Sequence, residues 1–403
     1  MNTSYDMVIC GGGLVGATLG LSLAHLPLSI AIIDPTPSSH RATRTDDRTF
    51  TLSLGTKRAL TTLGVWPLIP AASINAIRRI HVSDTRGGFG FTHLDAGEIG
   101  VEALGYVTES GALWDALRAA LARTPITLIT GTVRAALRRD GRHDITVDCA
   151  QGPQTLTARL LVGADGTASA VRALAGITVL RRSYGREALV VNCGVTRPQR
   201  DTAFERFGAE GPLAALPTGR NQYTMVISQR RADDLLALAD TDFLKRLQAL
   251  FGERLGTFTS AGRRLSFPLA LVRARTPVGD GVVLVGNAAQ TLHPVAGQGF
   301  NLGLRDAAAL ADHVARAVKR GLAIDSPAVL AAYARARGTD TGSTMAFTDR
   351  LVRIFAVDGG LAATARNVAL TLIDCLPGAK QGLARQTMGL KGPVASILRG
   401  VRP

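Results

Sequence analysis

Lysine, aromatic side chains and closely spaced cysteines are all scarce in this sequence, and each scarcity excludes a class of protein. Only five of the 46 basic residues are lysine, so the formal net charge of +15 comes almost entirely from arginine. A charge of this sign favours an anionic partner, either a nucleic acid or a membrane surface. Aromatic residues make up 5% of the chain and are not interleaved with arginine, as single-strand stacking platforms require. We therefore expect no nucleic-acid partner.

Cysteine usage and hydropathy set further limits. The four cysteines, at positions 10, 149, 193 and 375, form no CxxC pair, which argues against a disulfide framework or a metal site and fits a reducing compartment. A run without charged residues, at 7–33, is as long as a membrane span, but Asp6 precedes it and glycine, histidine and proline interrupt it. With 403 residues, 46% of them hydrophobic, the chain is predicted to fold as two or three domains without a membrane span.

The charge-free run divides into a strand, a glycine turn, a helix and a second strand. The run GGGLVG at positions 11–16 matches the pattern G-x-G-x-x-G. We predict a strand at 6–10 before it, a helix at 14–25 after it and a second strand at 29–34. This context is that of a dinucleotide-binding βαβ unit.

Each glycine of the pattern has a mechanical reason. Gly11 would make the tight turn, Gly13 would let the backbone approach a pyrophosphate, and Gly16 would let helix and strand pack closely. Asp34, at the end of the second strand, is placed to accept hydrogen bonds from a ribose with free hydroxyl groups. An acidic residue here favours FAD or NAD over a phosphorylated ribose, and the motif does not distinguish FAD from NAD. Its place at the start of a long chain favours a flavoprotein.

Two later segments repeat the alternation of strand, turn and helix. The run LLVGADG at 160–166 predicts a buried strand that enters a turn at Asp165. A second apolar strand, at 281–286, leads through a turn at 291–299 into a helix at about 300–320. The glycines and Pro294 of this turn would hold backbone close to a flat ligand ring, next to a second helix N-terminus.

In this order and spacing, the three motifs resemble those of the single-component flavin aromatic hydroxylases, the p-hydroxybenzoate hydroxylase class. Four blocks, at 47–53, 205–213, 266–271 and 285–306, closely resemble the bacterial ubiquinone-biosynthesis hydroxylases. The combination is most similar to the branch that hydroxylates 2-polyprenyl-6-methoxyphenol. The resemblance extends from about residue 5 to about residue 374.

The resemblance implies an α/β fold, with a Rossmann-like FAD-binding domain, an inserted antiparallel β-sheet substrate domain and a helical C-terminus. Alternating apolar and polar residues at about 183–267 independently predict antiparallel strands, and 74–83 is expected to add another strand to them. The predicted boundaries are 1–73, 106–182 and 273–335 for the FAD-binding domain, 74–105 and 183–272 for the substrate domain, and 336–403 for the C-terminal helices.

The resemblance also implies which residues bind FAD. They are Gly11, Gly13 and Gly16 at the pyrophosphate, Asp34 at the adenosine ribose, Arg48 beside the phosphates and flavin, the backbone of Val133 at adenine, Asp165 between flavin and nicotinamide, Asn287 at the ribityl chain, and Pro294, Gly297, Gln298, Gly299 and Asn301 along the isoalloxazine.

Two residues of the third motif differ from the other predicted FAD contacts. Asn287 stands where the wider class has an aspartate, and the same asparagine occurs in the 2-polyprenyl-6-methoxyphenol branch. His293 is a candidate to polarise a phenol, but a packed histidine before Pro294 is the favoured interpretation. No other catalytic residue and no metal ligand are assigned.

The reaction implied by the resemblance begins with reduction of FAD by NAD(P)H. Reduced flavin and O₂ then give a C4a-hydroperoxide, which hydroxylates an electron-rich polyprenylated phenol in a pocket that excludes water. No second G-x-G-x-x-G occurs, so no separate NAD(P)H domain is expected. The alternatives are a sister hydroxylase that attacks another ring carbon and a non-catalytic member of a ubiquinone-synthesising complex.

The C-terminal segment leaves two interpretations open. Leu361, Ala365, Val368, Leu372 and Leu376 fall on one face of a predicted helix. After position 374 the chain has no acidic residue but carries Lys380, Arg385, Lys391, Arg399 and Arg402. This tail would either lie on an anionic bilayer or pack on the FAD domain. We expect a cytoplasmic protein, peripheral to the inner membrane if the basic surface binds lipid.

Overall fold

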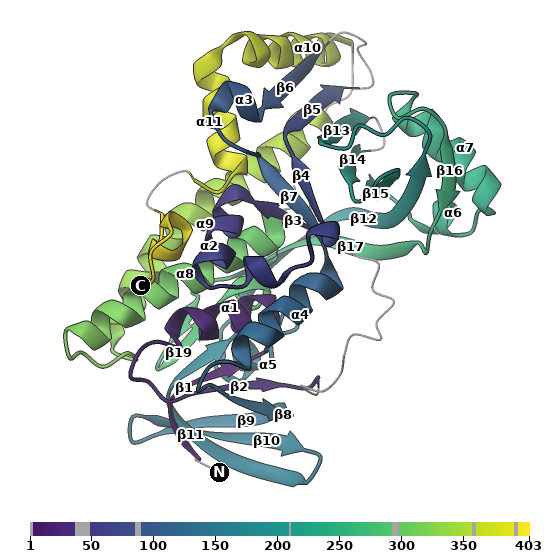
Figure 1. Cartoon of the computed structure of the whole chain (residues 1–403). Coiled ribbons are helices and arrows are strands. Elements are labelled where there is room, and N and C mark those ends of the chain that lie inside the picture. The colour runs from purple at the N-terminus through teal and green to yellow at the C-terminus, as the bar shows by residue number, and fades with distance from the viewer. Residues whose placement is uncertain are drawn as a thin grey trace.

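The structure is a computed structural model that describes residues 3–36, 49–84, 90–208, 211–291, 298–356, 360–390 and 394–403. Three sheets organise these residues. A parallel-centred sheet lies beside α1, α4 and α8, a long antiparallel sheet forms a lobe to one side, and a small sheet lies between them (Figure 1).

The first sheet contains the strands predicted from the apolar runs. Its central strands pair in parallel and are buried on both faces, which is why they appear in the sequence as continuous apolar runs instead of alternating ones. In spatial order the strands are β18 (Val278–Gly279), β19 (Val282–Leu284), β11 (Gly152–Gly163), β1 (Ser4–Cys10), β2 (Ile30–Asp34) and β8 (Thr127–Thr130), with β10 (Arg142–Cys149) paired to β11 and β9 (Thr132–Arg139) paired to β10.

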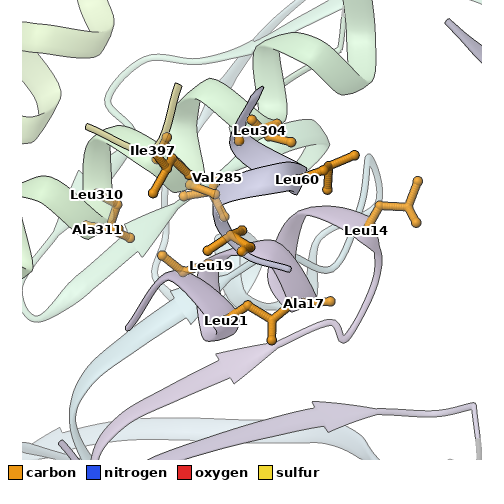
Figure 2. Packing of buried hydrophobic residues seen from close by; sticks show 14 of the residues in the cluster. Leu14, Ala17, Leu19, Leu21, Leu60, Val285, Leu304, Leu310, Ala311 and Ile397 are labelled. Carbon is orange, nitrogen blue, oxygen red and sulfur yellow. The ribbon is translucent and has the colours of Figure 1, made fainter. Parts of the chain in front are cut away.

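Helix α1 (Leu14–Leu23) packs between this sheet and α8 (Gln298–Lys319). Figure 2 shows Leu19 of α1 on the side of Val285, just after β19, and Leu21 on the opposite side of the helix, and both belong to the cluster that contains Leu304 and Leu310 of α8. All five side chains are buried. The core therefore fixes the N-terminal ends of both helices at one edge of the sheet.

The second sheet confirms the antiparallel strands predicted at about 183–267. In spatial order it contains β20 (Gln290–Thr291), β17 (Leu265–Ala274), β12 (Val179–Val195), β15 (Gln222–Gln229), β14 (Gly211–Pro217), β13 (Thr202–Gly208), β5 (Arg79–Asp84) and β6 (Phe91–Asp95), with β16 (Phe258–Ala261) paired to β12.

Two helices interrupt that stretch, α6 (Asp233–Leu236) and α7 (Asp240–Phe251), and the sequence reading did not separate them from the strands. In α7 the buried side chains Phe243, Leu247 and Phe251 recur every four residues, a spacing that places them on one helical face against the sheet.

The prediction that residues 74–83 add a strand to the second sheet is confirmed for β5 (Arg79–Asp84) and wrong for the residues before it. β4 (Ile74–Ile77) joins a small sheet with β7 (Gly105–Glu109) and β3 (Thr49–Ser53), whereas β5 joins the second sheet in parallel with β13. The backbone amides of Arg78 and Arg79 both donate to the carbonyl of Asp201, at 2.8 and 3.0 Å. These bonds redirect the chain, so the segment passes from one sheet to the next.

The C-terminal part is helical, as predicted. It comprises α9 (Pro327–Ala356), α10 (Gly360–Cys375), α11 (Pro377–Thr387) and the 3₁₀ turn η5 (Ser396–Arg399). The other helices are α2 (Leu54–Thr62), α3 (Ala96–Ile99), α4 (Ser110–Leu121), α5 (Ala170–Leu174) and the 3₁₀ turns η1 (Trp66–Leu68), η2 (Ala71–Ser73) and η3 (Gly286–Ala288).

The described part of the tail packs on the core formed around α1 and α8. Ala384, Met388, Ile397 and Leu398 are buried in the cluster that also contains α1 and α8, and Figure 2 shows Ile397 there. Lys380 forms ion pairs with Glu98 and Asp374. No helix within the described ranges is long and apolar enough to cross a membrane.

Candidate functional site

The turn at 11–16 is shaped by glycines with different surroundings. Gly11 has a φ of +99°, and a Cβ there would collide with the carbonyl oxygen of Ala164. A Cβ at Gly16 would collide with the carbonyl oxygen of Gly11. A Cβ at Gly13 would meet no other described atom within 4 Å. Gly13 therefore borders open space at the N-terminal end of α1, where free N–H groups and the helix dipole attract a phosphate.

Asp34, at the end of β2, is hydrogen-bonded to this turn. Its Oδ2 accepts a hydrogen bond from the amide of Gly12 at 2.7 Å, and its Oδ1 accepts one from the amide of Thr36 at 2.8 Å. Each carboxylate oxygen keeps a further lone pair for a ribose hydroxyl. The amide of Gly131 donates to the carbonyl of Asp34 at 3.0 Å, which brings the start of β9, with Val133, beside the same site.

Asp165 lies at the opposite side of the turn and has an acceptor to spare. Its Oδ2 accepts a hydrogen bond from the amide of Val171 at 3.1 Å. Its Oδ1 is buried and has no hydrogen-bond partner among the described residues. A buried acceptor of this kind is costly unless a ligand or water satisfies it, so Asp165 fits a ligand that donates hydrogen bonds. Burial and the Asp165 charge raise the pKa of Cys10, which makes this nearby thiol unreactive.

Buried side chains fix the position of the third motif. Gly286 has a φ of +62°, and its amide donates to Oδ2 of Asp306 at 2.9 Å. Asp306 is fully buried and pairs with Arg337 at 2.6 Å. The turn η3 consequently presents Asn287 as an exposed side chain. Asn287 is thus free to meet a ligand while its neighbours are fixed.

The Asn301 side chain makes hydrogen bonds to three residues within the protein. Oδ1 of Asn301 accepts hydrogen bonds from the amide of Ser53 at 2.8 Å and from the hydroxyl of Thr56 at 2.7 Å. Its Nδ2 donates to the carbonyl of Thr51 at 2.9 Å. The side chain ties α8 to β3 and α2, and a contact of Asn301 with a flavin stays a prediction.

Four of the predicted residues, Arg48, His293, Pro294 and Gly297, lie outside the described residues. Gln298 begins α8, and Gly299 follows it. The contacts of all predicted residues with FAD stay predictions. No group of His, Cys, Asp or Glu side chains in the described ranges is placed to hold a metal ion.

The three motifs meet at one cavity of about 520 Å³, within the range of small-molecule sites. On one side it is lined by Gly13, Leu14 and Val15 of the first motif, Ala164 and Gly166 of the second, and Asn287, Thr291, Gly299 and Phe300 of the third, with Thr49, Phe50 and Thr51 of β3. On the other side it is lined by Ala188, Val190, Glu205, Ala214, Leu216, Thr224, Val226, Phe267, Pro268 and Leu269 of the second sheet.

The sequence analysis did not single out Glu205. It is the one side chain with a titratable group among the described lining residues, and burial raises its pKa to about 7. The signal was a charged residue within an apolar strand in the block 205–213, but a glutamate there is also typical of a solvent-facing position.

The glycine turn, the orphaned acceptor of Asp165 and exposed Asn287 together fit an extended cofactor along the first sheet. The apolar wall of the second sheet leaves room for a ring beside it. An apolar cavity of this kind beside a cofactor site suits a flat, apolar ligand.

Comparison with known proteins supports this arrangement. Residues 4–346 match the family described as FAD binding domain. The chain is 38% identical to a Rhodospirillum rubrum protein named ubiquinone hydroxylase UbiL, over 98% of this chain and 93% of that protein. It is 33% identical to the 3-demethoxyubiquinol 3-hydroxylase of Escherichia coli, over 84% of this chain and 87% of that protein.

The fold also matches proteins whose sequences are much less similar to this one. The crystal structure of p-nitrophenol 4-monooxygenase PnpA from Pseudomonas putida matches with a TM-score of 0.81 at 15% identity, over 97% of this chain and 99% of that one. The predicted fold class is therefore confirmed.

Proposed function

Because the chain belongs to the family of FAD-dependent hydroxylases of ubiquinone biosynthesis, we propose that it hydroxylates the ring of 2-polyprenyl-6-methoxyphenol with O₂ and NAD(P)H. The predicted family and FAD cofactor are confirmed by this membership, with which NAD(P)H as co-substrate agrees. The choice of phenol and ring carbon is our proposal.

The observation that carries the proposal is the single cavity shared by the three cofactor motifs and the apolar face of the second sheet. FAD, when bound, supplies the activation of O₂ with electrons from NAD(P)H. The chain's own residues hold it: Gly13 and the N-terminus of α1 at the pyrophosphate, Asp34 at the ribose, and Asp165 and Asn287 nearer the flavin.

Substrate binding falls to the second sheet in this proposal. Val190 and Leu269, from neighbouring strands, line the cavity together with Phe267. Phe300, at the start of α8, closes it from the cofactor side and packs on Phe50 at a ring-centroid distance of 5.6 Å. These apolar walls exclude water and position a ring that carries a prenyl chain.

A sister hydroxylase acting on another ring carbon is the second candidate, because one relative is the 3-demethoxyubiquinol 3-hydroxylase of Escherichia coli. Asn287, the residue of the methoxyphenol branch, favours the first candidate. The open space at Gly13 and the unsatisfied acceptor of Asp165 argue against a non-catalytic member of the ubiquinone-synthesis complex, since both suit a bound cofactor.

Quinone profiling of a strain that lacks this protein tests the choice. Accumulation of 2-polyprenyl-6-methoxyphenol, reversed by the wild-type gene, supports the proposal. Accumulation of demethoxyubiquinol or another intermediate reassigns the ring carbon, and an unchanged quinone profile contradicts the proposed function.

We further propose that the anionic membrane surface is a partner, reached through the C-terminal helices. Val368 and Leu372 of α10 and the following Leu376 are 45%, 54% and 55% exposed. Exposed apolar side chains at the end of a helix suit an interfacial contact that gives access to a polyprenylated substrate. Lys380 contributes little to it, because its charge is paired with Glu98 and Asp374.

A further inference from the structure

We propose that Glu205 is a catalytic residue, whose carboxylate accepts the hydrogen bond of the substrate's phenol group and takes its proton as the ring is hydroxylated. This inference rests on the proposed function, because it assumes that a phenol occupies the cavity. It assigns the phenol-binding group that the motifs leave unnamed.

The position of Glu205 on β13 places it on the inner face of the sheet. Side chains alternate along a strand, so Ala203, Glu205 and Phe207 share one face, and Phe204 and Arg206 share the other. On the far face, Phe204 and Arg206 pack against the aromatic ring of Phe251. The inner face is the one that lines the cavity, and on it the glutamate stands between two apolar neighbours.

Nothing within the described protein satisfies the Glu205 carboxylate. Its partners across the ladders are Ala214 of β14 and Val82 of β5, neither of which offers a side-chain donor. No hydrogen bond or ion pair of Glu205 occurs within the described ranges. Burial is the one cause that raises its pKa. A carboxyl group in an apolar cavity without a partner is costly for folding, which indicates that it serves a ligand.

The charged groups on the strands around Glu205 lie on the opposite face or away from the cavity. Glu205 is therefore the principal titrating group there. By the ladder register, Arg79 and His81 of β5 lie on the opposite face with Thr202 and Phe204. Asp84 shares the inner face at the far end of β5, opposite Phe207. β14 has no titratable side chain, and Tyr223 of β15 lies in the core of the far face.

The proton balance of the step is simple. The phenol O–H bond breaks, its electron pair stays on the phenol oxygen and increases electron density on the ring, and the proton forms an O–H bond with Glu205. One oxygen atom of O₂ forms the new C–O bond and the other leaves as water, with the two electrons supplied by NAD(P)H, and the ring hydrogen that the hydroxyl replaces leaves as a proton to solvent. The protonated glutamate then returns its proton to the product oxygen or to solvent. General-base assistance of this kind contributes about 100-fold or more to a rate.

A binding titration tests the contact without turnover. The probe is 4-nitrophenol, whose phenolate is coloured, bound to the FAD-loaded oxidised wild type and to the Glu205→Gln variant across a range of pH. In the wild type the carboxylate opposes a second negative charge and holds the bound phenol in its neutral form. We expect Glu205→Gln to lower the pKa of the bound phenol by about one unit or more and to bind the phenolate about tenfold more tightly at alkaline pH.

Turnover supplies the second readout. With 2-methoxy-6-prenylphenol carrying one isoprene unit, Glu205→Gln should hydroxylate about 100-fold more slowly. It should also lose the increase in rate that the wild type shows as pH rises through about 7, where Glu205 ionises. Glu205→Asp, which keeps a carboxylate one methylene further back, should retain that increase at an intermediate rate.

Glu253→Gln is the matched control, because Glu253 is an exposed glutamate outside the cavity lining. It should behave as the wild type in both assays. Equal nitrophenol titrations for wild type and Glu205→Gln, with hydroxylation intact in both, would overturn the Glu205 proposal alone. A wild type that binds FAD but neither binds nor hydroxylates the phenols would overturn the proposed function, and the Glu205 proposal with it.

Discussion

Gly11 and Gly13 lie two residues apart in one motif, yet they differ in whether the folded protein has room for a side chain there. Gly11 is required for folding, because its φ of +99° and the Ala164 carbonyl exclude a side chain. Gly13 has an ordinary φ of −55° and borders open space. Only the second glycine is therefore reserved for the ligand.

This difference predicts separable effects of alanine at the two sites. Gly13→Ala should fold normally but bind FAD at least about tenfold more weakly, because the methyl group occupies space that the pyrophosphate needs. Gly11→Ala should destabilise the protein by about 1–3 kcal/mol through backbone strain. Fluorescence titration with FAD and thermal unfolding measure the two effects, and equal unfolding temperatures for both variants would contradict this division.

At Glu205 the structure predicts a dependence of stability on pH. The pKa of this carboxyl is raised from 4.5 to about 7 on folding, so between these values the folded protein retains a proton that the unfolded chain releases. The free energy of unfolding should therefore fall as pH rises through this window, by on the order of 2 kcal/mol from this residue.

Glu205→Gln should remove this fall in the free energy of unfolding with rising pH. The variant should unfold at the wild-type temperature near pH 4.5 and at a higher temperature above pH 7 in thermal scans. Glu253→Gln, which replaces an exposed carboxyl, should track the wild type throughout. A Glu205→Gln variant less stable than the wild type above pH 7 would show that the carboxylate has a stabilising partner.

At the scale of elements, the third motif combines a cofactor contact with a structural tie. Asn287 is exposed at the cavity, whereas Asn301, 14 residues later, is 1% exposed and joins α8 to β3 and α2. The same residue type, at two positions of the block 285–306, thus serves two different purposes.

The two asparagines form a matched pair for mutation. Asn301→Ala should cost about 2–3 kcal/mol, because it leaves the Ser53 amide and the Thr51 carbonyl unpaired. Asn287→Ala should leave the unfolding temperature unchanged and weaken FAD binding. Denaturant unfolding and FAD titration distinguish the two, and a larger stability loss for Asn287→Ala would contradict the assignment.

The elements that were predictable from the sequence are those specified locally. The strand before Gly11 and the helix after it follow from apolar runs and a glycine turn, so they were found at nearly the observed bounds. The division of residues 74–83 depends on Asp201, over 120 positions away, which receives the amides of Arg78 and Arg79. Glu205 was missed for a similar reason, since which face of its strand meets a cavity depends on strands brought together only by the fold.

For the whole molecule, the position of the C-terminal helices bears on the proposed membrane contact. α10 lies beside β5 and β6, with α11 following it, and both are far from the hairpin of β9 and β10, which extends from the opposite end (Figure 1). Val368, Leu372 and Leu376 make this end exposed and apolar.

A single substitution tests this surface. Leu372→Asp should weaken binding to vesicles that contain anionic lipid by about tenfold, because it removes one leucine from the interface and adds repulsion. Leu137→Asp is the matched control, since Leu137 on β9 is 58% exposed at the opposite end. Equal vesicle binding by the two variants in a sedimentation assay would exclude α10 as the membrane contact.

The central claim is that the cavity joins a flavin to a phenol so that oxygen from O₂ enters the ring. Its most direct test is incubation of the FAD-loaded protein with NAD(P)H, ¹⁸O₂ and 2-methoxy-6-prenylphenol, followed by mass spectrometry. The account predicts a ring-hydroxylated product with one ¹⁸O atom, formed in step with NAD(P)H oxidation. NAD(P)H oxidation that yields only hydrogen peroxide, with the phenol bound and unchanged, would contradict it.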